Sequence, residues 1–340
     1  MDKLFGKTLG ELKNLCTKHG FAAYTGNQLS EWLYKKKISG FEEMTNLSKG
    51  VRSLLSSSYE LGIQEPIDVQ KSIDGTKKYL FPTVPDKFIE TAYIPDGKRG
   101  TVCVSSQVGC KMGCLFCMTG KQGFQGNLTS GEILNQYRSL PEWKNITNIV
   151  YMGMGEPLDN LDEVLKSLEI LTSDWGFGLS PRRITVSTIG ITPALLKFLE
   201  NSDAHLAVSL HSPFDDDRRK LMPVQQVYPL KEILGEIRSW DFGRQRRISF
   251  EYILFKGFND TAAHVNELSR ILHRIRCRIN LIRFHPIPDS PLESPDEGTI
   301  EYFKERLIAK GITTTVRASR GQDIWAACGL LSTKKLQNKA

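Results

Sequence analysis

The sequence predicts an α/β protein: a partial (βα)6 barrel, preceded by a small helical domain and a β-hairpin extension. Apolar β-branched runs alternate with amphipathic segments from about residue 100 onward, which is the pattern of parallel βα units. The length of 340 residues suits one large domain with an accessory. Hydrophobic content of 40% and charged content of 24% are those of a soluble globular protein, and no apolar run approaches the roughly 18 residues of a membrane-crossing helix.

The chain before the barrel divides into two predicted parts. Residues 1–60 are predicted to form a helical accessory domain, because apolar side chains recur at three- and four-residue spacings in three stretches. These stretches cover residues 6–20, 26–37 and 46–58. Residues 61–95 are predicted to form a hairpin connector, since alternation around the Asp-Gly pairs at 74–75 and 96–97 indicates two hairpins, over residues 68–83 and 88–106.

Six strand candidates make up the predicted barrel core of residues 96–325. They cover residues 101–107, 146–155, 182–190, 205–211, 247–255 and 278–286. Helix candidates lie between them, at residues 130–140, 161–174, 192–201, 229–240 and 260–275. Six strands are too few for an eight-fold barrel, so we expect a partial barrel or open sheet with its functional loops at the carboxyl ends of the strands. A last strand-like run at 313–319 leads into a C-terminal segment, residues 326–340.

The seven cysteines narrow the chemistry. The N-terminus mixes charge with amphipathic periodicity and lacks the apolar core of a signal peptide, so a cytoplasmic protein is expected. In that reducing compartment cysteines are metal ligands, catalytic thiols or buried apolar side chains more often than disulfides. The net charge of +7 is compatible with a polyanionic partner but does not identify RNA. Cys16 and Cys277, outside every motif, are expected to be buried structural thiols.

Cys110, Cys114 and Cys117 form a C-x3-C-x2-C pattern on a predicted loop just after a strand. A 4Fe-4S cluster held by only three cysteines leaves one iron free for a substrate or cofactor. A zinc site would be expected to add a fourth Cys or His, and the sequence has no second cysteine pair at zinc-ligand spacing. Inert core cysteines are the other alternative. We therefore predict a 4Fe-4S cluster on this loop.

The stretch YMGMGEPL, residues 151–158, ends the next predicted strand with two glycines and a carboxylate. Gly155 permits close backbone approach, and Glu156 can accept hydrogen bonds from an ammonium group. A bare strand-to-loop turn is the simpler interpretation of the stretch taken alone. Its position after the cysteine motif favours a binding loop.

With Phe116 before its last cysteine, the C-x3-C-x2-C motif resembles the radical S-adenosylmethionine (SAM) superfamily. The resemblance implies that the open iron chelates the amino acid end of SAM, whose one-electron cleavage yields a 5'-deoxyadenosyl radical. It also implies SAM contacts from residues that end further strands: Gly155, Glu156, Ser187, Ser209, Leu210 and His211. The chain departs from the pattern at His285, which stands where many relatives have an asparagine that contacts SAM. Histidine can still offer a donor or acceptor there.

Four further stretches narrow the resemblance to the RlmN/Cfr family of RNA adenosine methyltransferases: CVSSQVGC, GFGLSPRRITVST, AVSLH and RASRGQDIWAACG. The likeness covers the chain from about residue 88 onward. It implies that one SAM methylates Cys328, that a second SAM activates this methyl group, and that its carbon then joins an adenine ring carbon. Cys103 matches the thiol that attacks Cys328 and releases the product as a transient disulfide forms. Glu90 matches the base that removes the ring proton.

The expected function is methylation of carbon 2 of one adenosine in 23S rRNA and one in tRNA, on an unstacked or flipped base. The expected partners are both RNAs and a one-electron donor such as flavodoxin or ferredoxin, with the chain acting as a monomer. Two alternatives stay open: Cfr-type methylation at carbon 8, which uses the same two cysteines, and a non-catalytic RNA-binding protein with a bound metal. RNA contacts are expected from scattered basic side chains, although such groups are usually solvated surface: Arg182, Arg183, Arg218, Arg219, Lys220, Arg244, Arg246, Arg247, Arg317 and Arg320.

Overall fold

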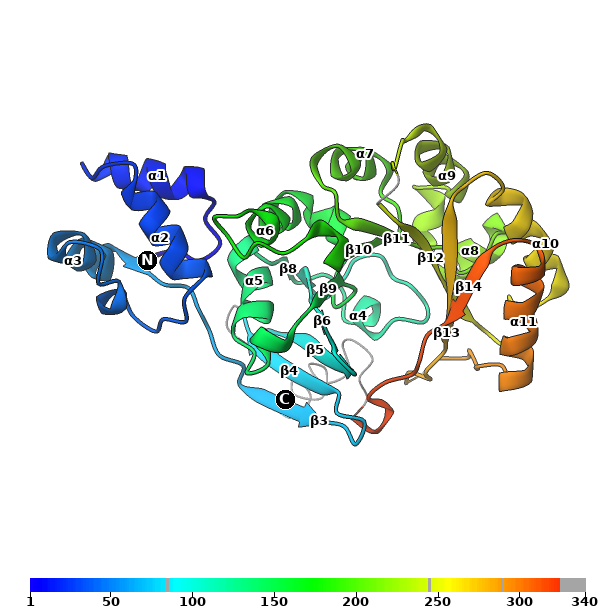
Figure 1. Cartoon of the computed structure of the whole chain (residues 1–340). Coiled ribbons are helices and arrows are strands. Elements are labelled where there is room, and N and C mark those ends of the chain that lie inside the picture. The colour runs from blue at the N-terminus through cyan, green and yellow to red at the C-terminus, as the bar shows by residue number, and fades with distance from the viewer. Residues whose placement is uncertain (84–85, 244–245, 289, 325–340) are drawn as a thin grey trace.

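The computed structural model describes residues 1–83, 86–243, 246–288 and 290–324. Its centre is a mixed sheet of ten strands in the order β14-β13-β12-β11-β10-β9-β6-β5-β4-β3, with helices around its outer face (Figure 1). The prediction of a partial α/β barrel with a helical N-terminal region is confirmed. None of the helices in the described part of the chain is long and apolar enough to cross a membrane.

Seven neighbouring strands of this sheet are parallel, and each pairs with the next one along. They are β6 (Arg99–Cys103), β9 (Asn148–Tyr151), β10 (Ile184–Thr188), β11 (His205–Ser209), β12 (Ile248–Leu254), β13 (Cys277–Arg283) and β14 (Thr313–Val316). The first six are the strands predicted for the barrel. The strand-like run at 313–319 extends the parallel series by one. Since all seven run the same way, their carboxyl ends and the loops that follow gather at one edge of the sheet.

Helices cover the outer face of the parallel strands: α5 (Ser130–Arg138), α6 (Leu161–Thr172), α7 (Thr192–Asn201), α8 (Asp215–Leu221), α9 (Leu230–Ser239), α10 (Ala262–Ile271) and α11 (Glu297–Ala309). Neither α8 nor α11 was predicted. Helix α8 is only seven residues long and begins with three aspartates, so it carries almost no apolar periodicity. Helix α11 begins at the Asp296 cap, whose side chain accepts from the Thr299 amide at 2.8 Å, and it buries Phe303 against the sheet.

The antiparallel half of the sheet consists of the two predicted hairpins. Strands β3 (Asp68–Lys71), β4 (Lys77–Pro82) and β5 (Phe88–Asp96) follow one another and join the barrel at β6. Two short ladders complete the described strands: β1 (Asp2–Lys3) with β2 (Tyr59–Glu60), and β7 (Gln107–Val108) with β8 (Gly126–Asn127). Pairing of β5 with β6 sets Ala92 opposite Cys103, which brings the hairpin against the barrel interior.

The N-terminal helices α1 (Leu9–Lys18), α2 (Thr25–Tyr34) and α3 (Lys49–Ser58) lie beside the barrel, and α3 is farther from α5 and α6 than α2 is (Figure 1). Two glycines allow the approach: a Cβ at Gly131 would stand 2.4 Å from the Phe5 carbonyl oxygen, and one at Gly6 would stand 2.3 Å from the Gly131 amide. The Ser130 hydroxyl donates to the Gly6 carbonyl at 2.9 Å. The helical unit is therefore packed backbone to backbone onto α5.

The chain after β14 crosses the open side of the barrel and returns to the turn between β3 and β4. We call this segment, residues 317–324, the strap. Its Gly321 amide donates to Asp74 at 2.8 Å, the Ser72 hydroxyl donates to Asp323 at 2.5 Å, and Arg320 pairs with Asp96 at 3.2 Å. The strap therefore connects the two edges of a sheet that does not close by strand pairing (Figure 1).

Candidate active site

The cysteine loop runs from β7 to the short helix α4 (Met118–Lys121), and Cys117 is the cap residue of that helix. The Cys117 amide donates to the Cys114 carbonyl at 3.1 Å, and the Cys110 amide donates to the Gly123 carbonyl at 3.1 Å. Gly109 has a φ of +70°, and a Cβ there would stand 1.8 Å from the Gly123 oxygen. Close contact between the two ends of the loop thus requires glycine at this position.

The thiols of this loop influence one another. Burial raises the pKa of Cys110 to about 12, assisted by the nearby Glu156 and Cys117. Burial also raises the pKa of Cys114 well above its ordinary value, with Cys117 and Cys110 adding to the rise. Neutral thiols so placed ionise when a cation binds, because a metal displaces their protons. Three thiols on one tight loop are the donor set of a site-differentiated 4Fe-4S cluster, so the residues present fit that group.

The described residues form no site for a single metal ion. No three His, Cys, Asp or Glu side chains of the described ranges converge closely enough to hold one metal ion. An iron-sulfur cluster spreads its ligands over several metal atoms, so it does not require such convergence.

The loop after β9 holds Gly155 and Glu156 against the strand β7 that leads into the cysteine loop. Gly155 has a φ of +94°, and a Cβ there would stand 2.5 Å from the Gln107 Cβ, so only glycine fits. The Glu156 amide donates to the Gln107 side-chain oxygen at 2.9 Å. The two segments that the sequence singled out separately are thereby in direct contact.

The Glu156 carboxylate is buried and bound mostly by the protein itself. Its Oε1 accepts from the Thr188 hydroxyl at 2.6 Å and the Leu158 amide at 3.0 Å, and its Oε2 accepts from the Ile189 amide at 3.0 Å. Three of about four acceptor positions are used, which leaves one for an incoming ammonium group. Burial raises the pKa of Glu156 to about 7 despite these hydrogen bonds. The carboxylate thus joins the β9 loop to the end of β10.

Ser187 and Ser209 end β10 and β11 on the side of the cavity described below. Ser187 shares the face of Thr185, which lines that cavity, because alternate residues of a strand point the same way. The Ser209 carbonyl accepts from Arg218 at 3.2 Å. Leu210 is fully buried, and its amide donates to the Glu251 carbonyl at 3.0 Å. Leu210 is not among the residues that line the cavity, so its contact with SAM stays a prediction.

His211 follows in a left-handed conformation, with a φ of +55°. Its Nδ1 accepts from the Ile253 amide at 3.0 Å, its carbonyl accepts from Asn259 at 2.7 Å, and its ring meets Phe116 edge-on at 4.7 Å. Burial, with Arg218 adding to it, lowers the pKa of His211 to about 3. The imidazole is therefore neutral and carries its proton on Nε2.

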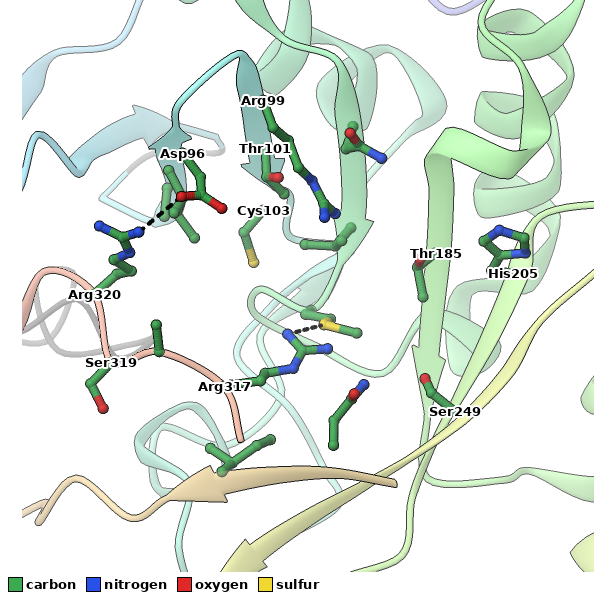
Figure 2. A pocket seen from close by; sticks show the side chains of 18 of the residues that line it. Asp96, Arg99, Thr101, Cys103, Thr185, His205, Ser249, Arg317, Ser319 and Arg320 are labelled. Carbon is green, nitrogen blue, oxygen red and sulfur yellow. Dashed lines mark hydrogen bonds and ion pairs between the residues drawn. The ribbon is translucent and has the colours of Figure 1, made fainter. Parts of the chain in front are cut away.

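Cys103 and His285 line one cavity of about 590 Å³ inside the partial barrel. Its walls come from both ends of the sheet, from Thr76 beside β4 to Arg317 after β14, so the sheet wraps around the cavity. In Figure 2 the Cys103 sulfur and the Arg317 guanidinium point into the same space. Burial, assisted by Arg283, lowers the pKa of His285, so this side chain is neutral at pH 7.

Glu90 lies on β5 in an ion pair that the sequence did not indicate. Its Oε2 stands 2.5 Å from the Lys78 ammonium, and the two side chains are only 2% and 1% exposed. Glu90 shares its strand face with Ala92, which lines the cavity beside Cys103, but Glu90 itself is not among the lining residues. Breaking a buried pair by removing one partner typically costs about 3–5 kcal/mol, so Lys78 and Glu90 are mutually dependent.

Cys328 lies outside the described residues, so its position and its disulfide with Cys103 stay predictions. The strap nevertheless brings the chain close: Arg317, Ala318, Ser319 and Arg320 line the same cavity as Cys103. Cys328 follows Ile324, the last described residue, by four positions, and four extended residues span at most about 14 Å.

Basic side chains surround the cavity at the amino ends of the strands. We call them the arginine rim: Arg99, Arg182, His205, Arg247 and Arg278. The cavity is lined by seven arginines and one acidic side chain, Asp96. Neither Arg247 nor Arg278 forms a salt bridge within the described residues, and both help burial to lower the pKa of His205. A second cavity of about 460 Å³ adjoins the rim and is lined by Arg182, Arg247 and Arg278 as well.

Sequence reasoning missed the polar interior of the barrel. On β12 and β13 the side chains of Ser249, Glu251 and Asn280 form one hydrogen-bonded group, which Arg317 joins at 3.1 Å from Glu251. The signal was present in the runs ISFEY and CRINLIR, where polar and apolar residues alternate within strands whose two faces would otherwise both be apolar. Period-two alternation in a parallel strand thus indicates a hydrated or ligand-binding lumen.

Two basic residues expected at the RNA surface are not available there. Arg218 is fully buried. Arg246 donates to the Ala204 and Leu199 carbonyls at 2.9 and 3.1 Å, and its guanidinium lies 5.2 Å from the Phe198 ring centroid. The expectation that Arg218 and Arg246 contact RNA is therefore wrong, because a run of basic residues in a sequence does not show which side chains are buried. Arg244 lies outside the described residues.

The stability of the chain should depend on the ionisation of Glu156. Its folded-state pKa of about 7 lies above the ordinary 4.5, so the neutral form favours folding and this stabilisation is lost as the pH rises from about 4.5 through 7. In chemical denaturation over that range, the unfolding free energy of the wild type should therefore fall by about 3 kcal/mol relative to that of Glu156→Gln. A difference that stays constant with pH would contradict the assignment.

Comparison with known proteins places the chain in a family. Residues 104–268 match the model of the radical SAM superfamily, and residues 3–61 match the ribosomal RNA large subunit methyltransferase N-terminal domain. A crystal structure of a radical SAM methyltransferase from Sphaerobacter thermophilus superposes with a TM-score of 0.90 at 39% identity, over 97% of this chain and 98% of that one. These findings agree with the cysteine loop and the partial barrel described above.

Curated relatives match over nearly the whole length. A probable dual-specificity RNA methyltransferase RlmN from Parabacteroides distasonis is 56% identical over 98% of this chain and 97% of its own. The dual-specificity RNA methyltransferase RlmN from Syntrophus aciditrophicus is 44% identical over 98% and 97%. The resemblance found from the motifs is confirmed, and the chain belongs to the RlmN family of radical SAM RNA methyltransferases.

Proposed function

We propose that the chain methylates carbon 2 of adenosine 2503 in 23S rRNA and of adenosine 37 in tRNAs, through S-methylcysteine at Cys328 and with two SAM molecules per turnover. The observation that carries the proposal is the position of Cys103. It lies in a cationic cavity inside the barrel, apart from the cysteine loop, and the strap that precedes Cys328 lines the same cavity. A resolving thiol has to occupy such a place.

Family membership implies a 4Fe-4S cluster and SAM. Cys110, Cys114 and Cys117 would hold the cluster, and when bound it supplies the single electron that cleaves SAM. The Gly155 backbone and the remaining acceptor position of Glu156 would bind the amino group of SAM. Ser187, Ser209, the Leu210 backbone and the His211 Nε2–H would bind its ribose and carboxylate. His285, neutral and in the cavity wall, would contact its adenine.

Cys103 supplies the release step. Its thiolate would attack the Cys328 sulfur, so that a sulfur-sulfur bond forms while the bond from that sulfur to the transferred carbon breaks. The electron pair goes to that carbon, which takes up a proton and becomes the methyl group. Such attack requires a thiol that binds no metal. Cys103 would meet this requirement, because it is the last residue of β6, a strand and a loop away from the cysteine motif.

Glu90 would accept the proton from the adenine ring carbon, with Lys78 as its fixed partner. The pair at 2.5 Å keeps the carboxylate oriented along the inner face of β5. The ammonium also balances the charge of Glu90 in a region that water does not reach, where an unpaired carboxylate would cost several kcal/mol. Proton uptake by Glu90 would then leave the Lys78 charge uncompensated, which favours return of the proton before the next turnover.

The arginine rim would bind the RNA backbone on either side of the flipped adenosine. A base that leaves the stack to enter a cavity carries its flanking phosphates to the cavity mouth, and arginine binds phosphate through paired donors. The charge balance of seven arginines against one carboxylate in the lining suits such a polyanion. An external one-electron donor such as flavodoxin or ferredoxin, action as a monomer and a cytoplasmic location complete the proposal.

The product should identify the reaction directly. Anaerobic turnover of the reconstituted chain with a 23S rRNA fragment and with tRNA, followed by mass spectrometry of the nucleosides, should yield 2-methyladenosine from both. Finding only 8-methyladenosine would establish the Cfr-type alternative. A protein that assembles no iron-sulfur cluster and leaves SAM intact would instead favour the non-catalytic RNA-binding alternative.

Loss of one rim arginine should weaken RNA binding in a salt-dependent way. Arg278→Gln should lower the affinity for substrate RNA and reduce the slope of log K against log salt by about 1, because one phosphate contact is lost. Arg270→Gln is the matched control, since Arg270 is exposed on α10 and paired with Glu267 at 2.5 Å. Equal salt slopes for the two variants, measured by fluorescence anisotropy, would show that the rim does not bind phosphate.

Without its resolving thiol the chain should retain its product. Cys103→Ala, isolated from cells, should carry a covalent RNA adduct that nuclease digestion reduces to a nucleotide mass on Cys328, located by peptide mass spectrometry. Cys277→Ala is the control, because that thiol, which is half-buried rather than fully buried as expected, lies outside the cavity that holds Cys103. A Cys103→Ala protein that carries no adduct, or that releases methylated RNA at the wild-type rate, would exclude the role given to Cys103.

A further inference from the structure

Arg218 is a buried cation for which the proposed mechanism has no use so far. It begins the basic run of α8, yet its side chain is 0% exposed, whereas the neighbouring Arg219 side chain is 47% exposed. Its guanidinium donates to the Gln225 side-chain oxygen, to the Ile189 carbonyl at 3.0 Å and to the Ser209 carbonyl at 3.2 Å. Its Nε has no partner within the described residues.

All of these hydrogen-bond acceptors are neutral. No carboxylate of the described residues forms a salt bridge with Arg218. Asp215 is connected to it through Gln225, whose Nε2 donates to Asp215 at 2.7 Å, and raises the Arg218 pKa from a longer distance. A buried charge without an ionic partner costs several kcal/mol. Burial accordingly lowers the pKa of Arg218 to about 10. A fully buried arginine of this kind is therefore expected to have an anion nearby that compensates its charge.

The cysteine loop, whose thiols would become negative on binding the cluster, lies next to the helix that carries Arg218. Burial lowers the pKa of Arg218, and Cys114 is the group that most raises it again. Burial raises the pKa of Cys114, and Arg218 is the cation that lowers it. The loop is also joined to α8 directly, because the Leu115 amide donates to the Leu221 carbonyl at 2.9 Å. Arg218 thus lies between the cysteine loop and the carboxyl ends of β10 and β11.

We propose that Arg218 is the fixed counter-charge of the three-cysteine site, where it favours the more negative, reduced state of the bound iron-sulfur cluster and so raises its reduction potential. The inference rests on the proposed cluster at Cys110, Cys114 and Cys117. One electron from the external donor adds one negative charge to the site, and no bond forms or breaks at Arg218. A guanidinium suits this task because it stays protonated even when buried.

The same side chain positions the SAM loops. By donating to the carbonyls of Ile189 and Ser209 it connects the end of β10 with the end of β11, next to Ser187 and His211. The charge that stabilises the reduced cluster is therefore held by the strand ends that would bind SAM. Arg218 acts through these groups and is a positioning residue, which contacts no reacting atom.

The test compares charge with packing in the full chain reconstituted under anaerobic conditions. Redox titration followed by electron paramagnetic resonance should show that Arg218→Gln loses at least tenfold in the equilibrium constant for one-electron reduction, which is a fall of about 59 mV in midpoint potential. Arg218→Lys, which keeps the charge, should fall by much less. Arg219→Gln is the control on the same helix and should titrate like the wild type, since Arg219 is exposed and paired with Asp216 at 3.0 Å.

Equal potentials for Arg218→Gln and the wild type, or equal shifts for the Gln and Lys variants, would overturn the inference. If Arg218→Gln fails to retain the cluster, iron and sulfide contents decide: retention by Arg218→Lys supports a charge requirement, and equal loss by both variants contradicts it. A wild-type chain that assembles no 4Fe-4S cluster would instead sink the proposed function. The two failures are therefore distinguishable.

Discussion

The sheet of this protein wraps around a cavity without closing, and the other features of the site depend on that constraint. A closed barrel of this kind fills its interior with apolar side chains. Here the edges β14 and β3 do not pair, and the interior holds polar and charged groups instead. Parallel pairing from β6 to β14 gathers the loops of the cysteine motif, Glu156 and Ser209 at one end. The opposite end presents the arginine rim.

Each buried charged side chain described above also connects two segments of the chain through its hydrogen bonds or its ion pair. Glu156 joins the β9 loop to the end of β10, Lys78 and Glu90 join β4 to β5, and Arg218 joins β10 to β11. Because an uncompensated buried charge is costly, each tie is specific to one arrangement of the backbone. The groups that would bind SAM and RNA are therefore positioned by electrostatics that also hold the fold in register.

Much of this was predictable from the sequence. The six barrel strands, the hairpins around the Asp-Gly turns and the loop of Cys110, Cys114 and Cys117 follow from periodicity, turn residues and spacing, which are local signals. The direction of Arg218 and the pairing of Lys78 with Glu90 could not be predicted, because burial of one member of a charged run is decided by tertiary packing. The expected SAM residues Ser187, Ser209 and His211 end adjacent strands, as parallel order requires. The helix α8 escaped prediction because a seven-residue segment that begins with three aspartates shows no apolar face.

The strap has a kinetic consequence. It is fastened to the β3–β4 turn and β5 by hydrogen bonds and one ion pair, and only three residues lie between Ile324 and Cys328. A thiol on so short a tether is held at an effective concentration on the order of millimolar relative to groups within its reach. Cys103 and Cys328 lie far apart in the sequence, yet they would then meet in a unimolecular encounter. The rate of that encounter is independent of the protein concentration in the cell.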